Sequence, residues 1–394
     1  MQVAIALTSS AGQLSGVQRH AINLARCLLT RAEIKAVHLI AAPWQQDFVH
    51  DAAPRNDARL HLHTARVRNS SLSRNMWYYM ELPRVAAQLN ADVVHLGYPM
   101  PLNKGAYHCP TVVTLHDLYP YDVPENFGFP KVLLNRFVLR QCLQSVDAVA
   151  CVSAGTRARL EGVEPRLALE KAVVIYNCVE AQARVSASSP LPRWNGEPFL
   201  LCVAQHRRNK NILFLLRFFE QLLRAGRVPD GTRLVIVGIS GPETNTILRF
   251  LAEAKIADRV ALLNGLSDEQ LQWCYRNAEL LLAPSLVEGF GLPVAEALLA
   301  GCRVICSDIP AFRELGGDRC LYIPLNASAE RGFADAVCAA IRERPSTPVA
   351  LPQLSAPFLA EQYLQLYRSL LFPASTADAA AIRAIRISEG NHTL

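Results

Sequence analysis

Short apolar runs repeat along most of this 394-residue chain and alternate with segments of helical spacing. An apolar run of this kind is typical of a strand that is buried on both faces of a parallel sheet. In the first half of the chain the predicted strands are Val3–Leu7, Val37–Ala42, Asp92–Leu96, Thr111–Leu115 and Ala148–Val152. Helical spacing is found between them, over Val17–Leu29 and Lys131–Gln144. This alternation predicts an α/β fold with parallel sheets.

A second series of strands and helices follows a segment rich in Ser, Pro and Ala, residues 181–196, which we interpret as a linker. Its predicted strands are Phe199–Val203, Arg233–Gly238, Val260–Leu263, Leu280–Ala283 and Arg303–Cys306. We therefore expect two doubly wound domains, over residues 1–180 and 197–355. A last helix is predicted over Phe358–Leu371, and the small, polar residues 373–394 are predicted to form a flexible tail.

Composition narrows the class of protein. Hydrophobic residues make up 51% of the chain and charged residues 19%, as in ordinary globular proteins. The net charge of +6 suits an anionic ligand or lipid surface but gives no case for nucleic acid. Eleven cysteines without a Cys-x-x-Cys pair indicate reduced thiols and a cytoplasmic protein without a metal site. Because no apolar stretch approaches the roughly 20 residues of a spanning helix, any membrane contact is expected to be peripheral.

The most informative local feature is a pair of glutamates, Glu288 and Glu296, in the sequence PSLVEGFGLPVAEALLAG that begins at Pro284. A carboxylate on a helix with apolar neighbours is costly to bury without a partner, and ligand hydroxyl groups are suitable partners. Gly289 and Gly291 allow backbone N–H groups to approach a ligand, and the following helix N-terminus favours a phosphate. The segment is therefore predicted to bind a sugar and a phosphate. The alternative is a capped helix with a glutamate in the core.

The glutamate spacing and the intervening Gly-Phe-Gly-Leu-Pro resemble the E-x7-E signature of retaining glycosyltransferases, in particular of glycosyltransferase family 4. The resemblance spans nearly the whole chain and is strongest between Phe199 and Asp318. It implies the GT-B fold, in which two Rossmann-like domains with parallel sheets face a central cleft and a closing helix returns to the first domain. It also implies front-face transfer of a sugar from a GDP- or UDP-linked donor. No metal or cofactor is implied, because cationic side chains and helix dipoles act on the diphosphate.

A basic run, Arg207-Arg208-Asn209-Lys210-Asn211, follows the first strand of the second domain. Preorganised cations of this kind stabilise the charge that develops on a leaving diphosphate. The family places an arginine and a lysine here, and Lys210 matches the lysine. Gln205 occupies the position of the family's arginine, so the resemblance leaves Arg207 or Arg208 to replace it. The alternative is a solvated basic loop.

The resemblance assigns roles to further residues. His116, in Thr-Leu-His-Asp-Leu, and Glu288 would position the donor sugar, and Glu296 would hold the ribose hydroxyl groups. The remaining residues expected at the donor are Gly16, Asn264, Gly289, Phe290, Gly291 and Leu292. For Gly16 a tight turn is an equal alternative. The loop at Asn264 also predicts a plain helix start, with Ser267 and Gln270 forming a capping box.

Arginines and aromatic residues interleave between Arg66 and Met80, and Lys131, Arg136 and Arg140 lie on another apolar helix. Such surfaces suit an anionic lipid interface, although half-buried helices with basic edges explain the pattern equally well. We therefore predict a hexosyltransferase, with mannose as the leading sugar, that acts on a glycan or lipid-linked acceptor in surface polysaccharide assembly, in the cytoplasm or at the inner face of the membrane. The alternatives are a sugar-nucleotide epimerase of the same fold and a non-catalytic nucleotide-sugar-binding protein.

Overall fold

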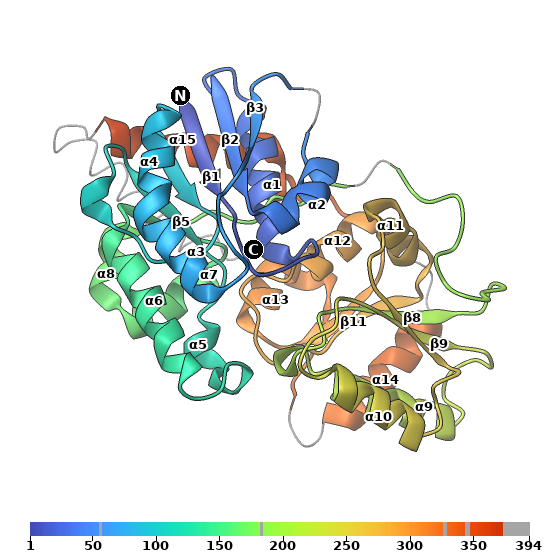
Figure 1. Cartoon of the computed structure of the whole chain (residues 1–394). Coiled ribbons are helices and arrows are strands. Elements are labelled where there is room, and N and C mark those ends of the chain that lie inside the picture. Colours follow the sequence, from blue (N-terminus) through green and yellow to red (C-terminus); the bar gives the residue numbers. More distant parts are fainter. Residues whose placement is uncertain (55–56, 182–183, 326–328, 343–346, 373–394) are drawn as a thin grey trace. The chain divides into compact units, whose positions relative to one another are not determined.

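A computed structural model of the chain describes residues 1–54, 57–181, 184–325, 329–342 and 347–372 (Figure 1). The chain divides into two compact units. The first unit consists of Met1–Val179 together with the chain from Pro352 onward, and the second unit is Glu180–Leu351. The predicted tail, residues 373–394, lies outside the described residues. Each unit is an α/β structure built on a parallel sheet, as predicted.

The first unit contains a seven-stranded parallel sheet in the order β3-β2-β1-β4-β5-β6-β7. Its strands are β1 Gln2–Ala6, β2 Ala36–Ala41, β3 Leu60–Thr64, β4 Val93–Leu96, β5 Thr111–Leu115, β6 Ala148–Cys151 and β7 Ala172–Val174. The five predicted strands are present to within one residue at each end. The sequence analysis missed the two edge strands. The sequence of β3, Leu-His-Leu-His-Thr, is not an apolar run, and β7 has only three residues.

Helices cover both faces of this sheet, because alternate residues of each buried strand point to opposite sides. Val3 and Ile5 of β1 face one core cluster, and Ala4 and Ala6 face the other. The first cluster is closed by α1 Gly16–Leu29, α2 Gln46–Ala52 and α15 Ala356–Leu371. The second is closed by α4 Leu82–Gln88, α6 Lys131–Ser145, α7 Ala154–Val163, α8 Pro165–Lys171 and the π-helical turn η2 Trp77–Glu81.

Two short helices and the final helix of the chain complete the first unit. Two further helices are α3 Ser71–Met76 and α5 Tyr119–Asp122. The final helix, α15, packs along α1, which is why the last part of the chain belongs to the first unit (Figure 1). None of the helices in the described parts of the chain is long and apolar enough to cross a bilayer.

The second unit contains a six-stranded parallel sheet in the order β10-β9-β8-β11-β12-β13. Its strands are β8 Phe199–Val203, β9 Arg233–Val237, β10 Val260–Leu263, β11 Leu280–Ala283, β12 Val304–Ser307 and β13 Leu321–Ile323. Its helices are α9 Ile212–Arg224, α10 Thr244–Glu253, α11 Asp268–Asn277, α12 Leu292–Ala300, α13 Pro310–Gly316 and α14 Ala329–Arg342. The order reverses beside β8, so the loops that follow β8 and β11 leave the same edge of the sheet side by side, where ligands bind in such sheets.

Candidate functional site

The loops after β8 and β11 bring Lys210 and Glu288 into direct contact, although 78 residues separate them in the sequence. Lys210 Nζ lies 2.5 Å from Glu288 Oε1, and the two side chains are only 19% and 10% exposed. A partly buried pair of this kind has a stronger Coulomb interaction than a surface pair, because less water screens it. The structure therefore joins the two residues that the sequence analysis had named independently.

Backbone contacts hold these two loops together. Leu286 N donates to Asn209 O at 2.8 Å, and the side chain of Asn209 is completely buried. Arg208–Lys210 form a short 3-10 turn, η5. Asn211 follows with a φ of +55°, a left-handed conformation that asparagine tolerates better than most residues. That conformation ends the turn and starts α9, and so fixes the position of Lys210.

Two serines that the sequence analysis missed hold Glu288 in place. Ser285 Oγ donates to Glu288 Oε1 at 2.7 Å. Ser307 Oγ, at the end of β12, lies 2.5 Å from the carbonyl oxygen of Ser285. The sequence signal that could have identified these residues is a serine at the end of each of two adjacent strands. Their contacts could not be read without the strand order.

Gly291 gives the Glu-x7-Glu segment its shape. It caps the N-terminus of α12 with a φ of +103°, which L-residues with a side chain rarely adopt. A Cβ atom added to Gly291 would lie 2.8 Å from the ring of Phe312. Gly289 and Phe290 are buried just before it, and Leu292 is the first residue of the helix. The backbone N–H groups at this helix start are therefore held by a turn that only glycine fits.

Glu296 lies within α12, as predicted, and its carboxylate accepts a hydrogen bond of 2.8 Å from the hydroxyl of Tyr275 on α11. Tyr275 is itself buried, and no sequence signal connected it with Glu296. A small pocket is lined by Lys210, Ser285, Glu288, Pro293, Val294 and Phe312, together with residues of β8 and β11. Glu296 is not among its lining residues.

The structure distinguishes Arg207 from Arg208. Arg207 is partly buried beside Gly241, whereas Arg208 is exposed. Gly238 and Gly241, both missed from the sequence, let the loop after β9 approach the loop after β8. Added Cβ atoms would lie 1.9 Å from Ala204 O and 2.5 Å from His206 O. These glycines fix the backbone on which Arg207 stands.

Asn264 follows β10 at the edge of the sheet, and β9 separates that strand from β8. Asn264 is exposed. The predicted helix cap is confirmed: Ser267 accepts from Gln270 N, and Gln270 Oε1 accepts from Ser267 N at 3.0 Å. The start of this helix was therefore predicted correctly from the sequence, and the role of Asn264 in donor binding stays a prediction.

In the first unit, His116 directly follows β5. Its Nε2 lies 2.9 Å from the carbonyl oxygen of Gly97. A carbonyl oxygen only accepts, so Nε2 carries the proton and Nδ1 is the acceptor nitrogen of the neutral ring. Burial lowers the pKa of His116 to about 4, so the ring is neutral near pH 7. The ring also contacts His20 edge to face, with the centroids 4.8 Å apart.

Gly16 is the first residue of α1, and the loop before it is held by polar side chains. Ser15 caps the helix together with Gln18, whose buried side chain also donates to Ser9 Oγ. Gln45 Nε2 donates to the same oxygen at 3.0 Å. This capping box was missed in the sequence. Gly16 therefore lies at the N-terminus of a helix that follows β1, as a phosphate contact requires.

Within the described ranges, no group of three or more His, Cys, Asp or Glu side chains is arranged to hold a metal ion. The eleven cysteines all lie in the described ranges, and none of them forms a disulfide. The site residues named above therefore offer cations, carboxylates, hydroxyl groups and backbone N–H groups to a ligand.

This chain is similar in sequence to known glycosyltransferases. Residues 14–183 match the family described as Glycosyltransferase Family 4, and residues 188–324 match Glycosyl transferases group 1. The O-antigen chain mannosyltransferase RfbU of Salmonella typhimurium is 28% identical over 57% of this chain, and the match spans 59% of that protein. The O-antigen chain mannosyltransferase B of Escherichia coli is 24% identical over 77% of this chain and 82% of its own length.

Solved structures show the same fold. Anabaena Alr3699/HepE, crystallised with UDP and glucose, aligns with a TM-score of 0.64 and 16% identity over 98% of this chain and all of its own. WaaG, a glycosyltransferase involved in lipopolysaccharide biosynthesis, aligns with a TM-score of 0.62 and 18% identity over 94% of this chain and 97% of its own. These are GT-B structures. The chain therefore belongs to the family 4 glycosyltransferases of the GT-B fold.

Proposed function

We propose that this chain is a retaining hexosyltransferase that moves mannose from a nucleotide-diphosphate sugar to a glycan or lipid-linked acceptor in surface polysaccharide assembly. The observation that carries the proposal is the Lys210–Glu288 pair beyond the carboxyl ends of β8 and β11, beside the glycine-capped start of α12. The names of the relatives above, O-antigen mannosyltransferases, support the sugar and the setting. The nucleoside diphosphate of the donor is GDP or UDP.

The pair suits departure of a diphosphate. As the bond between the sugar's anomeric carbon and the diphosphate oxygen breaks, negative charge grows on that oxygen. An ammonium group has three N–H donors, so Lys210 can hold Glu288 and also donate to a phosphate oxygen. The acceptor hydroxyl oxygen then bonds to the same face of the anomeric carbon, and its proton passes to the leaving diphosphate. Protein cations perform the role that a metal has in other transferases.

Arg207 is our choice for the second cation. Its partly buried position on a backbone fixed by Gly238 and Gly241 favours a preorganised contact, whereas the exposed Arg208 would have to be ordered by the ligand. Glu296 and the backbone of residues 289–292 are assigned to the donor nucleotide. His116 is assigned to the donor sugar.

A turnover assay with GDP-mannose and UDP-linked sugars tests the proposal. We expect free nucleoside diphosphate and a new glycoside of retained anomeric configuration. Lys210→Ala should lower turnover by about a hundredfold, and Arg207→Ala should lower it far more than Arg208→Ala. An isomerised donor would identify an epimerase instead. Tight donor binding without any product would identify a non-catalytic binding protein.

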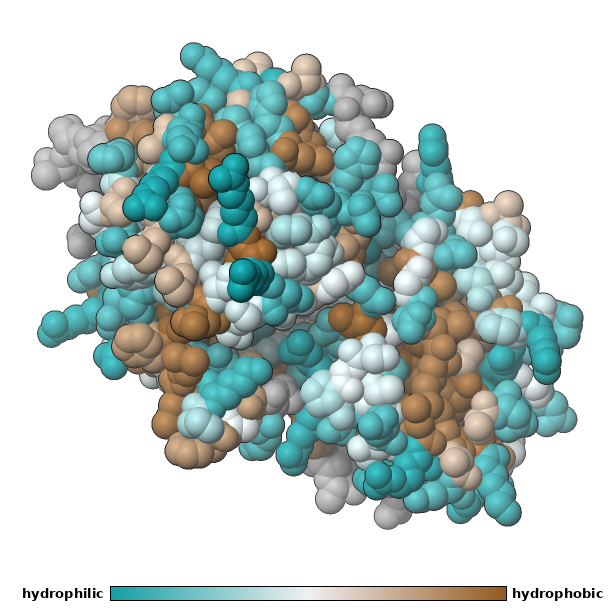
Figure 2. Space-filling model, viewed as in Figure 1, coloured by the Kyte–Doolittle hydropathy of each residue, from teal (hydrophilic) through white to brown (hydrophobic). Residues whose placement is uncertain are grey.

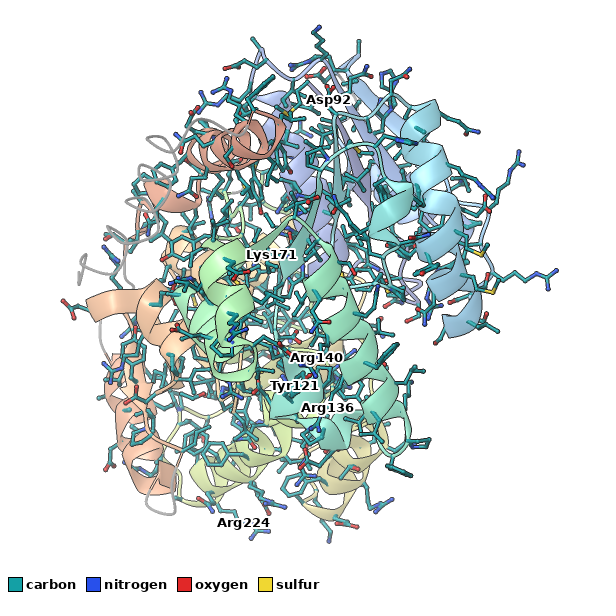
Figure 3. All side chains as sticks on the ribbon, turned by 90° about the vertical axis from the view of Figure 1, so that its left-hand side faces the viewer. Asp92, Tyr121, Arg136, Arg140, Lys171 and Arg224 are labelled. Carbon is teal, nitrogen blue, oxygen red and sulfur yellow. The ribbon has the colours of Figure 1, made fainter. Side chains whose placement is uncertain are left out.

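Contact with an anionic membrane is the second part of the proposal, and the structure changes which residues carry it. Trp77 and Tyr78 are buried in the core, so they cannot reach a lipid. Arg136 donates to Pro120 O at 2.8 Å and lies over the ring of Tyr121 (Figure 3). Arg140 forms an ion pair of 2.6 Å with Glu164. These side chains already have partners within the first unit.

Other side chains of the same two helical segments are exposed. Eight of the fifteen large apolar side chains that are exposed in the described chain lie here: Leu72, Met76, Tyr79 and Met80 on α3 and η2, Phe129 just before α6, and Leu133, Leu134 and Phe137 in its first half. Figure 2 shows hydrophobic residues gathered over α5 and α6. Both segments cover the same face of the sheet, and the exposed Arg66, Arg68 and Arg84 flank the first of them. Apolar side chains with basic neighbours suit an anionic lipid interface.

Vesicle flotation tests this contact. The protein should bind vesicles that contain phosphatidylglycerol, should release them at high salt, and should not bind vesicles of phosphatidylcholine alone. Phe137→Glu should weaken binding, whereas Leu248→Glu, a change at an exposed apolar residue of the second unit, should not. Equal binding by both variants, or self-association through this surface in sedimentation, would contradict the proposal.

A further inference from the structure

Behind His116 lies a buried chain of polar side chains that the proposed reaction does not use. Thr114 Oγ1 lies 3.0 Å from His20 Nε2 and 2.8 Å from His95 Nε2. His95 Nδ1 lies 2.7 Å from the hydroxyl of Tyr367. The four groups come from α1, β4, β5 and α15, and all are buried. The chain therefore runs from the last helix of the protein to the histidine whose ring packs against His116.

The single hydroxyl proton of Thr114 couples the two histidines. A threonine hydroxyl has one O–H donor, so only one of the two Nε2 atoms can accept from it, and the other must donate to it. The Tyr367 phenol is the natural donor to His95 Nδ1, since phenols are much stronger acids than neutral imidazoles. His95 Nε2 then donates to Thr114, and Thr114 donates to His20 Nε2. Every ring in this arrangement is neutral and has one tautomer.

Electrostatics supports the neutral arrangement. Burial lowers the pKa of His95 to about 3 and lowers the pKa of His20 well below its usual range. Each nearby imidazole lowers the pKa of His20 further, because two positive rings at this distance would repel each other. The rings of His116 and His95 therefore both oppose a positive charge on His20.

We propose that Thr114 is a positioning residue that, through His20, holds His116 with Nε2 protonated and Nδ1 presented as the acceptor for a hydroxyl group of the donor sugar. This inference rests on the proposed function for the identity of the ligand. The orientation of His116 comes from Gly97 O on one side and from the edge of His20 on the other. A ring that loses the second support can rotate or shift. A displacement of about 1 Å in such a group can cost on the order of a hundredfold in rate.

The matched control lies on the same strand. Thr111 is also buried on β5, but its hydroxyl donates to Asp147 at 3.0 Å, at the other end of the strand. Thr114→Val and Thr111→Val therefore each remove one buried hydroxyl group from β5, and only the first removes hydrogen bonds to the histidines. Tyr367→Phe removes the hydroxyl group that bonds to His95, at the other end of this series of hydrogen bonds, with less risk to folding.

Kinetics of a double-variant cycle test the proposal. Thr114→Val should lower kcat about tenfold more than Thr111→Val does, with the KM for the donor changed much less. Tyr367→Phe should lower kcat in the same direction by a smaller factor. In a His116→Gln background, Thr114→Val should have no further effect on kcat, because the ring on which it acts is gone. The same factor in both backgrounds would overturn the proposal.

Nitrogen NMR of the histidine rings gives a readout that does not depend on turnover. His116 should show a single Nε2–H tautomer in the wild type and in Thr111→Val, and a mixture in Thr114→Val. A single unchanged tautomer in Thr114→Val would overturn the proposal even if kcat falls. If the wild type forms no glycoside with any donor, the proposed function fails, and the NMR comparison still decides whether Thr114 positions His116.

Discussion

Each unit is built on its own parallel sheet and has its candidate site residues in loops that follow the strands, yet the two candidate sites use opposite electrostatics. Eight of the ten histidines of the chain lie within Met1–Val179 of the first unit, and His20, His95 and His116 are kept neutral by burial. The second unit holds a partly buried ion pair, Lys210–Glu288. Neutral rings suit recognition of sugar hydroxyl groups, whereas a fixed cation suits a leaving diphosphate. The difference indicates that two domains with the same sheet architecture can have different tasks, one recognising the sugar and the other stabilising charge.

The largest expected effect is on the charged site. Glu288→Gln keeps the volume of the side chain but removes the charge that holds Lys210. Turnover should fall on the order of a hundredfold to a thousandfold, the scale of losing a preorganised electrostatic group. Glu296→Gln, whose partner is Tyr275, should mainly raise the KM for the donor. If steady-state kinetics gave wild-type kcat and KM values for both variants, the charged site would have no role in turnover and the comparison would fail.

A stability effect should follow at the turn that shapes the same site. Gly291→Ala forces a Cβ into a left-handed conformation and against Phe312. We expect a loss of about 3 kcal/mol in the free energy of unfolding, measured by urea denaturation. The control is Gly162→Ala in α7, where a Cβ would contact nothing within 4 Å, and this change should not destabilise the protein. Equal midpoints for the two variants would mean that the turn relaxes without strain.

Acid should weaken the neutral site of the first unit. The folded-state pKa values of His95, about 3, and His116, about 4, lie below the unfolded value of 6.5. Between pH 6.5 and pH 4 the unfolded chain therefore binds protons that the folded chain does not, so stability falls as the pH falls. Each histidine should contribute about 2 kcal/mol of this loss between pH 6.5 and pH 5. His95→Gln should show a shallower dependence of urea midpoints on pH, and an unchanged slope would argue against neutral histidines.

The smallest expected effect concerns metal. If Lys210 and an arginine act on the diphosphate, excess EDTA should leave initial rates unchanged. The prediction depends on the protein's own cations, which take the place of Mg²⁺ at the diphosphate. Among the described residues, no group of three His, Cys, Asp or Glu side chains is placed to hold a metal ion. Rates measured in EDTA and after adding back Mg²⁺ provide the check. Complete loss that Mg²⁺ restores would show that a metal ion performs the charge stabilisation assigned to the second unit.

The interior strands were readable from the sequence because strands buried on both faces are continuous apolar runs. The edge strands β3, β7 and β13 were not, since they are short or interrupted by polar residues. Glu288 and Lys210 were named separately from a motif and a basic run. Their contact could not be predicted, because it depends on β8 and β11 being neighbours.

The supporting residues were harder to predict than the site itself. Ser285 and Tyr275 carry no pattern that distinguishes them from other buried polar residues. The interleaved aromatic residues misled in part, since Trp77 and Tyr78 point into the core while Tyr79 and Met80 point outward. Periodicity alone could not assign these faces, because the helix continues through the π turn η2, which shifts its register.

The return of α15 to the first unit has a consequence for how this protein is made. Its apolar residues, such as Leu359 and Leu364, lie in the same core cluster as α1 and β1, and its Tyr367 completes the contact with His95. A ribosome delivers these residues only after the whole of the second unit has been synthesised. The first unit, although it begins at the N-terminus, must therefore be the last to complete its core, and the second unit can fold while the first still waits for its final helix.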